Sequence, residues 1–160
     1  MLDTIWNELG GGFTHVPPEV AAIRLMVALA LGGVVGFERE MREKPAGLRT
    51  HMLVSMAACL FIIVGQQLGS MQFGSENASR VDPLRLIEAV TAGVAFLAAG
   101  IIFTSGGKVK NTTTGASMWL AGAIGLACGS GQMPLAMIAT VLVVIVMVLL
   151  RTVERWLGTH

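Results

Sequence analysis

Charge is scarce in this sequence, and its scarcity excludes several classes of protein. Only 13% of the 160 residues are Asp, Glu, Lys or Arg, whereas a soluble domain carries about 25%. Hydrophobic residues make up 54%, and the mean hydropathy is +0.72. A chain this short and apolar has more hydrophobic surface than one water-soluble core can hide, which excludes a large soluble catalytic domain. It also excludes a disordered chain, because disorder requires low hydrophobicity.

Cysteine and net charge are low as well. Cys59 and Cys128 lie in separate apolar runs without CxxC spacing, so we expect buried, inert thiols and neither a zinc site nor a disulfide framework. A net charge of +1 gives no basic field for nucleic acid. No Ser-His-Asp set, HExxH motif or catalytic carboxylate pair can be assigned. We therefore expect no enzymatic activity, no catalytic residue, no cofactor and no metal.

Long apolar segments dominate what is present. The sequence predicts an all-α integral membrane protein, a bundle of about five transmembrane helices, because each segment approaches the roughly 20 residues that a span needs. The expected spans are residues 20–37, 52–68, 86–103, 112–129 and 135–150. They form a transmembrane domain over residues 20–150. Residues 1–19 are expected to form a short amphipathic helix in the membrane interface, and residues 151–160 a short tail.

The distribution of basic residues predicts the orientation. The connections 38–49 and 104–111 and the tail 151–160 together hold eight Lys and Arg. The connection 69–85 holds two, and the connection 130–134 holds none. Basic residues accumulate in cytoplasmic loops. We therefore expect the N-terminus outside and the C-terminus in the cytoplasm.

The densest polar run lies between the first two spans. A carboxylate at a helix C-terminus opposes the helix dipole, so Glu38 is expected to need nearby positive charge, from Arg39, Arg49 or the N-terminus of a neighbouring helix. The predicted cytoplasmic-face network consists of Glu38, Arg39, Glu40, Arg49, Thr50, His51, Asn111 and Thr113. Such a network either fixes topology alone or binds a cation, a phosphate-bearing molecule or a partner protein.

The start of the fourth span is a second place where anions could bind. Asn111 or the threonines after it are expected to cap this helix. The alternative is an anion site at the same helix start, beside Lys108 and Lys110.

Two charges lie inside the expected spans, near the outer side. Arg24 and Glu88 each lie roughly 6 Å below the outer boundary, at 1.5 Å of rise per residue. An unpaired charge at that depth is costly, so we predict that the two side chains pair, within one chain or between two copies. The alternative is that Arg24 snorkels to the outer interface.

Small residues mark the expected helix contacts, since they let helix backbones approach closely. Gly32 and Gly36 form a GxxxG motif, and small residues recur at every fourth position within the fourth span. The predicted packing residues are Gly32, Gly36, Gly93, Gly100, Ser117, Ala121 and Gly125. Packing within one bundle is favoured over a dedicated homodimer face.

Four sequence blocks, taken in order, resemble the MgtC/SapB family of bacterial inner-membrane proteins. They are RLMVALALGGVVGFERE (24–40), AGLRTHMLVSMAA (46–58), DPLRLIEAVTAGVAFLAAGIIF (82–103) and TTTGASMWLAGAIGLACGSG (112–131). The resemblance implies an inner-membrane protein linked to growth at low magnesium and, in pathogens, to intracellular survival. The MgtC branch continues into a cytoplasmic C-terminal domain, so we expect either a short member or a chain without that domain.

The resemblance also implies a mechanism. It suggests a non-enzymatic regulator that restrains the F-type ATP synthase through membrane contacts. The alternative is a transporter or channel for a cation or small solute, with a path lined by Arg24, Glu88, Glu38 and Arg49. The span centres carry no acidic residue to hold a divalent ion, which favours the regulator. The expected partners are membrane lipid, the ATP synthase or another membrane protein, and a second copy of the chain.

Overall fold

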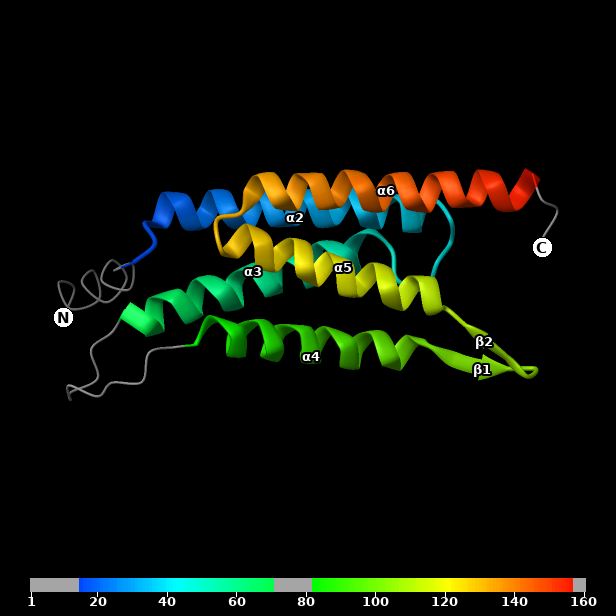
Figure 1. The fold of residues 1–160 in the computed structure, drawn as a ribbon, viewed down its shortest axis with the longest axis horizontal. Coiled ribbons are helices and arrows are strands. Elements are labelled where there is room, and N and C mark those ends of the chain that lie inside the picture. The colour runs from blue at the N-terminus through cyan, green and yellow to red at the C-terminus, as the bar shows by residue number, and fades with distance from the viewer. Residues whose placement is uncertain (1–14, 71–81, 157–160) are drawn as a thin grey trace.

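The computed structural model describes residues 15–70 and 82–156, and within them it is a helical bundle (Figure 1). The helices are α2 (Pro18–Glu40), α3 (Leu48–Ser70), α4 (Pro83–Ile101), α5 (Thr112–Gly129) and α6 (Met133–Trp156). This confirms the predicted all-α class, with one helix for each expected span. The amphipathic helix expected within residues 1–19 falls mostly outside the described residues.

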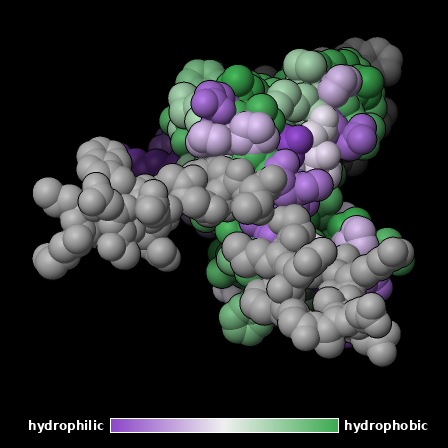
Figure 2. Space-filling model, turned by 90° about the vertical axis from the view of Figure 1, so that its left-hand side faces the viewer, coloured by the Kyte–Doolittle hydropathy of each residue, from purple (hydrophilic) through white to green (hydrophobic). Residues whose placement is uncertain are grey.

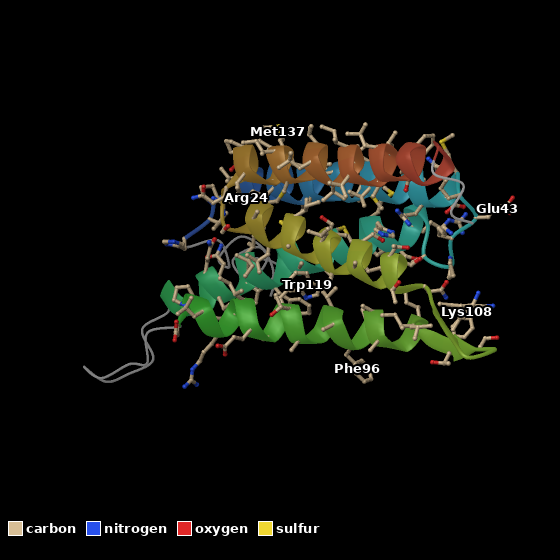
Figure 3. All side chains as sticks on the ribbon, turned by 45° about the vertical axis from the view of Figure 1, so that its right-hand side comes forward. Arg24, Glu43, Phe96, Lys108, Trp119 and Met137 are labelled. Atoms are coloured by element: carbon tan, nitrogen blue, oxygen red, sulfur yellow. The ribbon has the colours of Figure 1, made fainter. Side chains whose placement is uncertain are left out.

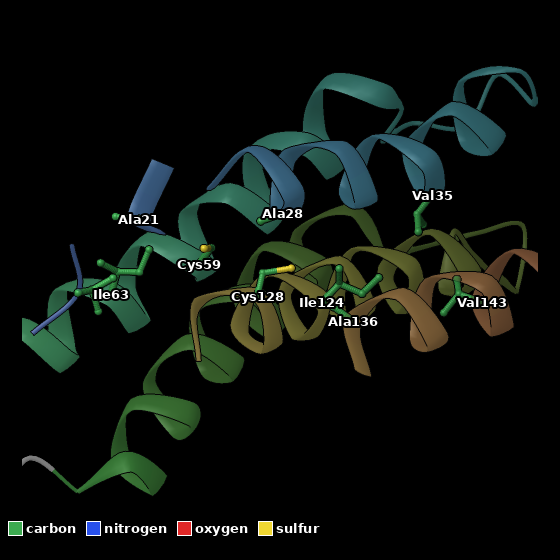
Figure 4. Close-up of a cluster of buried hydrophobic side chains, with 10 residues drawn as sticks. Ala21, Ala28, Val35, Cys59, Ile63, Ile124, Cys128, Ala136 and Val143 are labelled. Atoms are coloured by element: carbon green, nitrogen blue, oxygen red, sulfur yellow. The ribbon is translucent and has the colours of Figure 1, made fainter. Parts of the chain in front are cut away.

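The helices run along one long axis, with α5 at the centre. In Figure 1, α6 lies along α2 at one side of the bundle and α4 lies at the other. α5 contacts α2, α3, α4 and α6, while α4 packs mainly against α5 and more weakly against α3. The main hydrophobic core lies between α2, α3, α5 and α6 (Figure 4), with Ala28, Cys59, Ile124 and Cys128 all at most 1% exposed.

Small residues explain why α5 can occupy the centre. A Cβ atom added at Gly125 would collide with the backbone oxygen of Ser55 on α3, and one at Gly122 would lie 2.9 Å from Val94 Cγ2 on α4. Ser117 and Ala121 are also buried on α5. The GxxxG motif of α2 is used in the same way, since a Cβ at Gly32 would lie 2.7 Å from the backbone oxygen of His51.

Two of the predicted packing glycines are not at helix contacts. A Cβ atom at Gly93 or Gly100 would meet nothing within 4 Å, which corrects the prediction for these positions within one chain. The buried residues of α4 are Val90, Val94 and Ala98. The small partners in this contact belong to α5, so α4 presents its larger residues to the bundle and turns its glycines outward.

Among the described residues, three helices are long and apolar enough to cross a membrane, judged by length and composition. They are Pro18–Glu40, Leu48–Gly69 and Pro83–Ile101, whose mean hydropathies over an 18-residue stretch are 2.2, 1.8 and 1.7. The apolar part of α6, Met133–Leu149, is shorter. Large apolar side chains cover the flank of the bundle, and Figure 3 shows Met137 and Phe96 pointing away from it.

The third span ends earlier than expected, because a β-hairpin follows it. α4 stops at Ile101, and Phe103 begins strand β1 (Phe103–Ser105), which pairs antiparallel with β2 (Lys108–Lys110). Gly106 and Gly107 form the turn with φ values of +61° and +73°, a region that glycine enters without steric cost.

The segments richest in Lys and Arg lie at the same end of the bundle. We call this the basic end: the α2–α3 connection, the β1–β2 hairpin and the C-terminal end of α6 (Figure 1). Figure 3 shows Glu43 and Lys108 there and Arg24 towards the other end. The start of α2, the end of α3 and the α5–α6 turn form the opposite end. Figure 2 looks onto this opposite end, where hydrophilic residues appear on the end face and hydrophobic ones around the flank.

Candidate functional site

Glu38 is held between two arginines at the basic end. Its Oε2 lies 3.0 Å from Arg39 Nε, and its Oε1 lies 2.9 Å from Arg42 Nε. The Glu38 and Arg39 side chains are only 11% and 8% exposed. Sequence reasoning named Arg39 but missed Arg42, although an i,i+4 spacing from Glu38 was a readable signal. Arg49, the other expected cation, is exposed and makes no ion pair in the part of the chain that is described.

Glu40 has a different task from Glu38. Its Oε2 accepts a hydrogen bond of 3.0 Å from the backbone N–H of Leu48, the first residue of α3. A carboxylate is favourable at this end of a helix, where backbone N–H groups lack partners. Glu40 therefore fixes the start of α3 against the end of α2 and is not part of the Glu38 ion-pair cluster.

His51 connects α3 to α5 inside the bundle. The ring is fully buried, with Nδ1 at 2.8 Å from the backbone oxygen of Gly47 and Nε2 at 3.0 Å from Ser117 Oγ. Because a carbonyl oxygen only accepts, Nδ1 carries the proton of the neutral ring, and Nε2 is an acceptor that faces Ser117 Oγ. The Ser117 hydroxyl donates to the backbone oxygen of Thr114 at 2.9 Å, so its single proton is shared between that oxygen and His51 Nε2.

The other predicted network residues lie apart from this cluster. Asn111 Nδ2 donates to the backbone oxygen of Ile101 at 3.0 Å, so its side chain caps the end of α4. It makes no side-chain cap for α5, which corrects the expectation. Thr50 is half-buried on α3, and Thr113 is exposed. The expected eight-residue network is thus divided into an ion-pair cluster, two helix caps, the His51–Ser117 link and separate side chains.

A groove of about 1120 Å³ opens beside the ion-pair cluster, between α2, α5 and α6. Its polar part includes Glu38, Arg39, Arg42 and Lys44, with Thr113 from α5. The rest of its lining is largely apolar, and includes Val34 and Phe37 of α2 and Leu142 and Val146 of α6. The groove therefore joins a charged end to an apolar channel.

The charges in this groove do not balance. Arg39, Arg42 and Lys44 face the two carboxylates of Glu38 and Glu43, an excess of one positive charge among its lining residues. Within the described residues, Arg42 Nη1 is buried and has no hydrogen-bond partner, and Arg39 Nε contacts Glu38 without hydrogen-bond geometry. The groove can therefore accept a further anionic group.

The opposite end holds a second cation, the half-buried Arg24, with neutral partners. Arg24 Nη1 donates to the backbone oxygen of Gly129 at 2.8 Å and to Gln66 Oε1 at 3.2 Å. Glu88 is exposed on α4, and no ion pair joins it to Arg24 within the described chain. This corrects the predicted pair within one chain, because carbonyl oxygens at a helix C-terminus satisfy a cation without any acid.

The residue after Gln66 forms a further link that sequence reasoning missed. Gln67 Oε1 accepts from the backbone N–H of His15 at 2.8 Å, and its Nε2 donates to the backbone oxygen of Val16 at 3.0 Å. The segment before α2 is therefore fixed along the end of α3.

Comparison with known proteins places the chain in a family. A sequence model described as the MgtC family matches residues 25–156. Protein MgtC of Brucella abortus is 39% identical over 135 residues, which are 84% of this chain and 53% of that protein. The putative magnesium transporter YhiD of Escherichia coli K12 is 38% identical over 125 residues, which are 78% of this chain and 58% of the relative.

An uncharacterised protein of Synechocystis is 34% identical over 153 residues, covering 96% of this chain and 56% of the relative. The chain thus spans little more than half the length of these relatives. No solved structure matches it. The MgtC family match covers most of α2, all of α3, α4, α5 and α6, and the ion-pair cluster, and the chain belongs to the MgtC family.

Proposed function

We propose that this chain is the membrane-embedded part of an MgtC-type regulator, which acts through contacts at its basic end and neither catalyses a reaction nor conducts ions. One observation carries the proposal. Four charged side chains in the described residues have a buried atom without a hydrogen-bond partner. Three of them, Glu38, Arg39 and Arg42, line the surface groove at the basic end, and the fourth, Arg24, lies at the opposite end.

The bundle axis is filled by close helix contacts. A Cβ atom at Gly129 would lie 2.6 Å from the backbone oxygen of Cys59, and Gly125 is in even closer contact with α3. Ser55 Oγ, which is buried there, already donates to the backbone oxygen of Ala28 at 2.7 Å. A path for a hydrated cation would have to separate these backbones, which supports a role through surface contacts.

The second candidate function is magnesium transport, favoured by the printed name of the Escherichia coli relative. Magnesium binds oxygen ligands in near-octahedral geometry, with carboxylates contributing. Among residues 15–70 and 82–156, no group of three His, Cys, Asp or Glu is arranged to hold a metal ion. The regulator is therefore our first candidate.

The biological context that we propose follows the MgtC relatives: an inner-membrane protein needed for growth at low magnesium and for survival inside host cells. The partner that we propose is the F-type ATP synthase, contacted within the membrane. Because the relatives extend well beyond this chain, these activities are proposed for the membrane part that it represents.

Two assays on the same purified chain separate the two candidates. The purified chain is reconstituted into liposomes that enclose a magnesium-sensitive dye, and ATP-driven proton pumping is measured in inverted membrane vesicles with and without the chain. We expect no magnesium flux above empty liposomes and reduced proton pumping. Saturable magnesium flux would overturn the regulator, and unchanged pumping would remove the ATP synthase as its partner.

Charge variants locate the contact. Arg42→Gln is expected to relieve the effect on pumping, since Arg42 lines the groove. Lys110→Gln is the matched control, because Lys110 is exposed at the same end but lies on the hairpin outside the groove. Equal loss with both variants would indicate a general charge effect and not this site.

A further inference from the structure

The groove at the basic end has the chemistry of a lipid site, and we propose that it binds one anionic phospholipid. The phosphate of the headgroup lies against Arg39 and Arg42, and an acyl chain lies along the apolar channel between α2 and α6. This proposal rests on the proposed function in one respect, that the protein acts through its basic end. It adds the ligand that binds at that end.

Among the residues that the structure describes, the ion-pair cluster has one more cation than anion. Two guanidinium groups share the single carboxylate of Glu38, at 3.0 and 2.9 Å. The Arg39 side chain is more than nine-tenths buried, and Arg42 Nη1 is buried without an acceptor. A buried charge without a partner is costly. A phosphate supplies the missing acceptors, and the planar fork of arginine matches two phosphate oxygens at once.

The channel that leads away from the cluster is apolar. On α2 it is lined by Val34 and Phe37 at i and i+3, followed at i+7 by Met41, the residue just after this helix, and on α6 by Leu142 and Val146 at i,i+4. These residues lie on one face of each helix. At 1.5 Å of rise per residue, the α2 side of the channel is about 10 Å long, a third of the roughly 30 Å hydrocarbon core.

The ion-pair cluster and the apolar channel together favour a lipid over a small anion. Free phosphate would satisfy the arginines but would leave the large exposed side chains of the walls uncovered, since Val34, Phe37 and Val146 are each about half exposed (49%, 57% and 52%). A molecule with a phosphate joined to a hydrocarbon chain satisfies both. Basic pockets between membrane helices are known to bind anionic headgroups in this way.

The excess charge also favours an anionic headgroup over a zwitterionic one. A choline headgroup brings its own positive charge next to the phosphate, where Lys44 and the arginines already exceed the carboxylates. A glycerol headgroup brings no positive charge. We therefore expect phosphatidylglycerol to bind more tightly than phosphatidylcholine with the same acyl chains.

The test is a titration of the detergent-purified chain with phosphatidylglycerol, phosphatidylcholine or inorganic phosphate, followed by native mass spectrometry. We expect a single tight phosphatidylglycerol and weaker phosphatidylcholine. Arg42→Gln should weaken phosphatidylglycerol binding by about fivefold, the effect of one basic residue near an anionic surface, and should bring the two lipids closer together. Lys110→Gln, the matched control, should bind like the unmodified chain.

A second variant tests the channel without changing charge. Val146→Trp should fill the channel and weaken the binding of both lipids. Val148 also lines the groove and therefore cannot serve as the control position. Ile138→Trp is the control, since Ile138 is similarly exposed on α6 outside the groove. Melting temperatures in detergent show whether each variant is folded. If Arg42→Gln is not, Lys44→Gln replaces it, since Lys44 is an exposed basic residue of the same groove.

The outcomes that overturn the proposal are distinct. Equal binding of the two lipids to the unmodified chain, or an unchanged ratio in the Arg42 variant, would exclude a headgroup site at the arginines. If inorganic phosphate competes with phosphatidylglycerol at equal affinity, the groove is a site for free anions and not for a lipid. Binding that no channel variant alters would indicate that another protein segment fills the channel. Lipid binding is measured without ATP synthase or ion gradients. The lipid site can therefore be confirmed even if the proposed regulator function is refuted.

Discussion

Arg24 Nη1 donates to the backbone oxygen of Gly129 at 2.8 Å and so joins the second turn of α2 to the last residue of α5, 105 positions along the chain. The same guanidinium reaches Gln66 on α3. One side chain therefore connects three helices at the end of the bundle that lacks the ion-pair cluster. A cation at the C-terminus of α5 also complements the helix dipole.

Replacing Arg24 should destabilise the bundle. Arg24→Leu leaves the oxygens of Gly129 and Gln66 without their donor, and a hydrogen bond to a charged group contributes about 1.5 to 3 kcal/mol. Thermal unfolding in detergent measures the change, with Arg24→Lys expected to lose less because the charge remains. An unchanged melting temperature for Arg24→Leu would mean that Arg24 snorkels into the headgroups.

The same measurement tests the relationship between Arg24 and Glu88. In the chain described here Glu88 is exposed and not paired with Arg24. A double-mutant cycle with Arg24→Leu and Glu88→Ala should therefore give a coupling energy within about 0.5 kcal/mol of zero. A coupling energy well above that value would indicate a contact between two copies of the chain.

Gly125 and Gly93 should respond oppositely to the same substitution. Gly125→Ala forces a methyl group into the backbone of Ser55, and overpacking costs about 1 to 3 kcal/mol. Gly93→Ala meets open space and should be neutral or stabilising by about 0.5 to 1 kcal/mol, since alanine is the better helix former. Thermal unfolding of the two variants side by side checks this, and equal effects would contradict the described α3–α5 contact.

Ser117→Ala should reveal the link to His51. It leaves His51 Nε2, in a fully buried ring, without its partner at 3.0 Å, and an unsatisfied buried group costs about 1 to 3 kcal/mol. Ser105→Ala, on the exposed hairpin, is the control and should have little effect. Combining Ser117→Ala with His51→Ala should cost less than the sum of the two, whereas strict additivity would show that the two residues are not coupled.

Reporter fusions test the predicted orientation. Pro45 and Gly106 lie in connections at the basic end, and Gly131 lies in the turn at the opposite end. The positive-inside rule predicts cytoplasmic reporters at Pro45 and Gly106 and an external one at Gly131. The reverse pattern would invert the topology, and reporters on one side at all three positions would contradict the spanning bundle.

The helices were predictable because hydropathy reports directly on which segments avoid water. Each expected span corresponds to a helix. The β1–β2 hairpin was missed, since Phe103 continues the apolar run of α4 and only the turn at Gly106 and Gly107 interrupts it.

Side-chain partners were harder to predict than helices. Arg24 and Glu88 share a depth, but depth does not determine which way a side chain faces around its helix, and the main contact of α4 is with α5, not with α2. The partners of Arg24 are an amide and a backbone carbonyl, which carry no charge pattern in the sequence. Arg42 was missed because the expected span ended at residue 37, whereas α2 continues to Glu40.

The position of α4 constrains how the bundle is made. α4 buries only Val90, Val94 and Ala98, mostly against α5, and α5 is the next helix to be synthesised. When α4 leaves the ribosome, α2 and α3 can already associate with each other, but the principal partner of α4 does not yet exist. At a synthesis rate of roughly 5 to 20 residues per second, α4 lies in the lipid bilayer without α5 for a few seconds. Assembly of this membrane domain is therefore completed only when the last two helices insert.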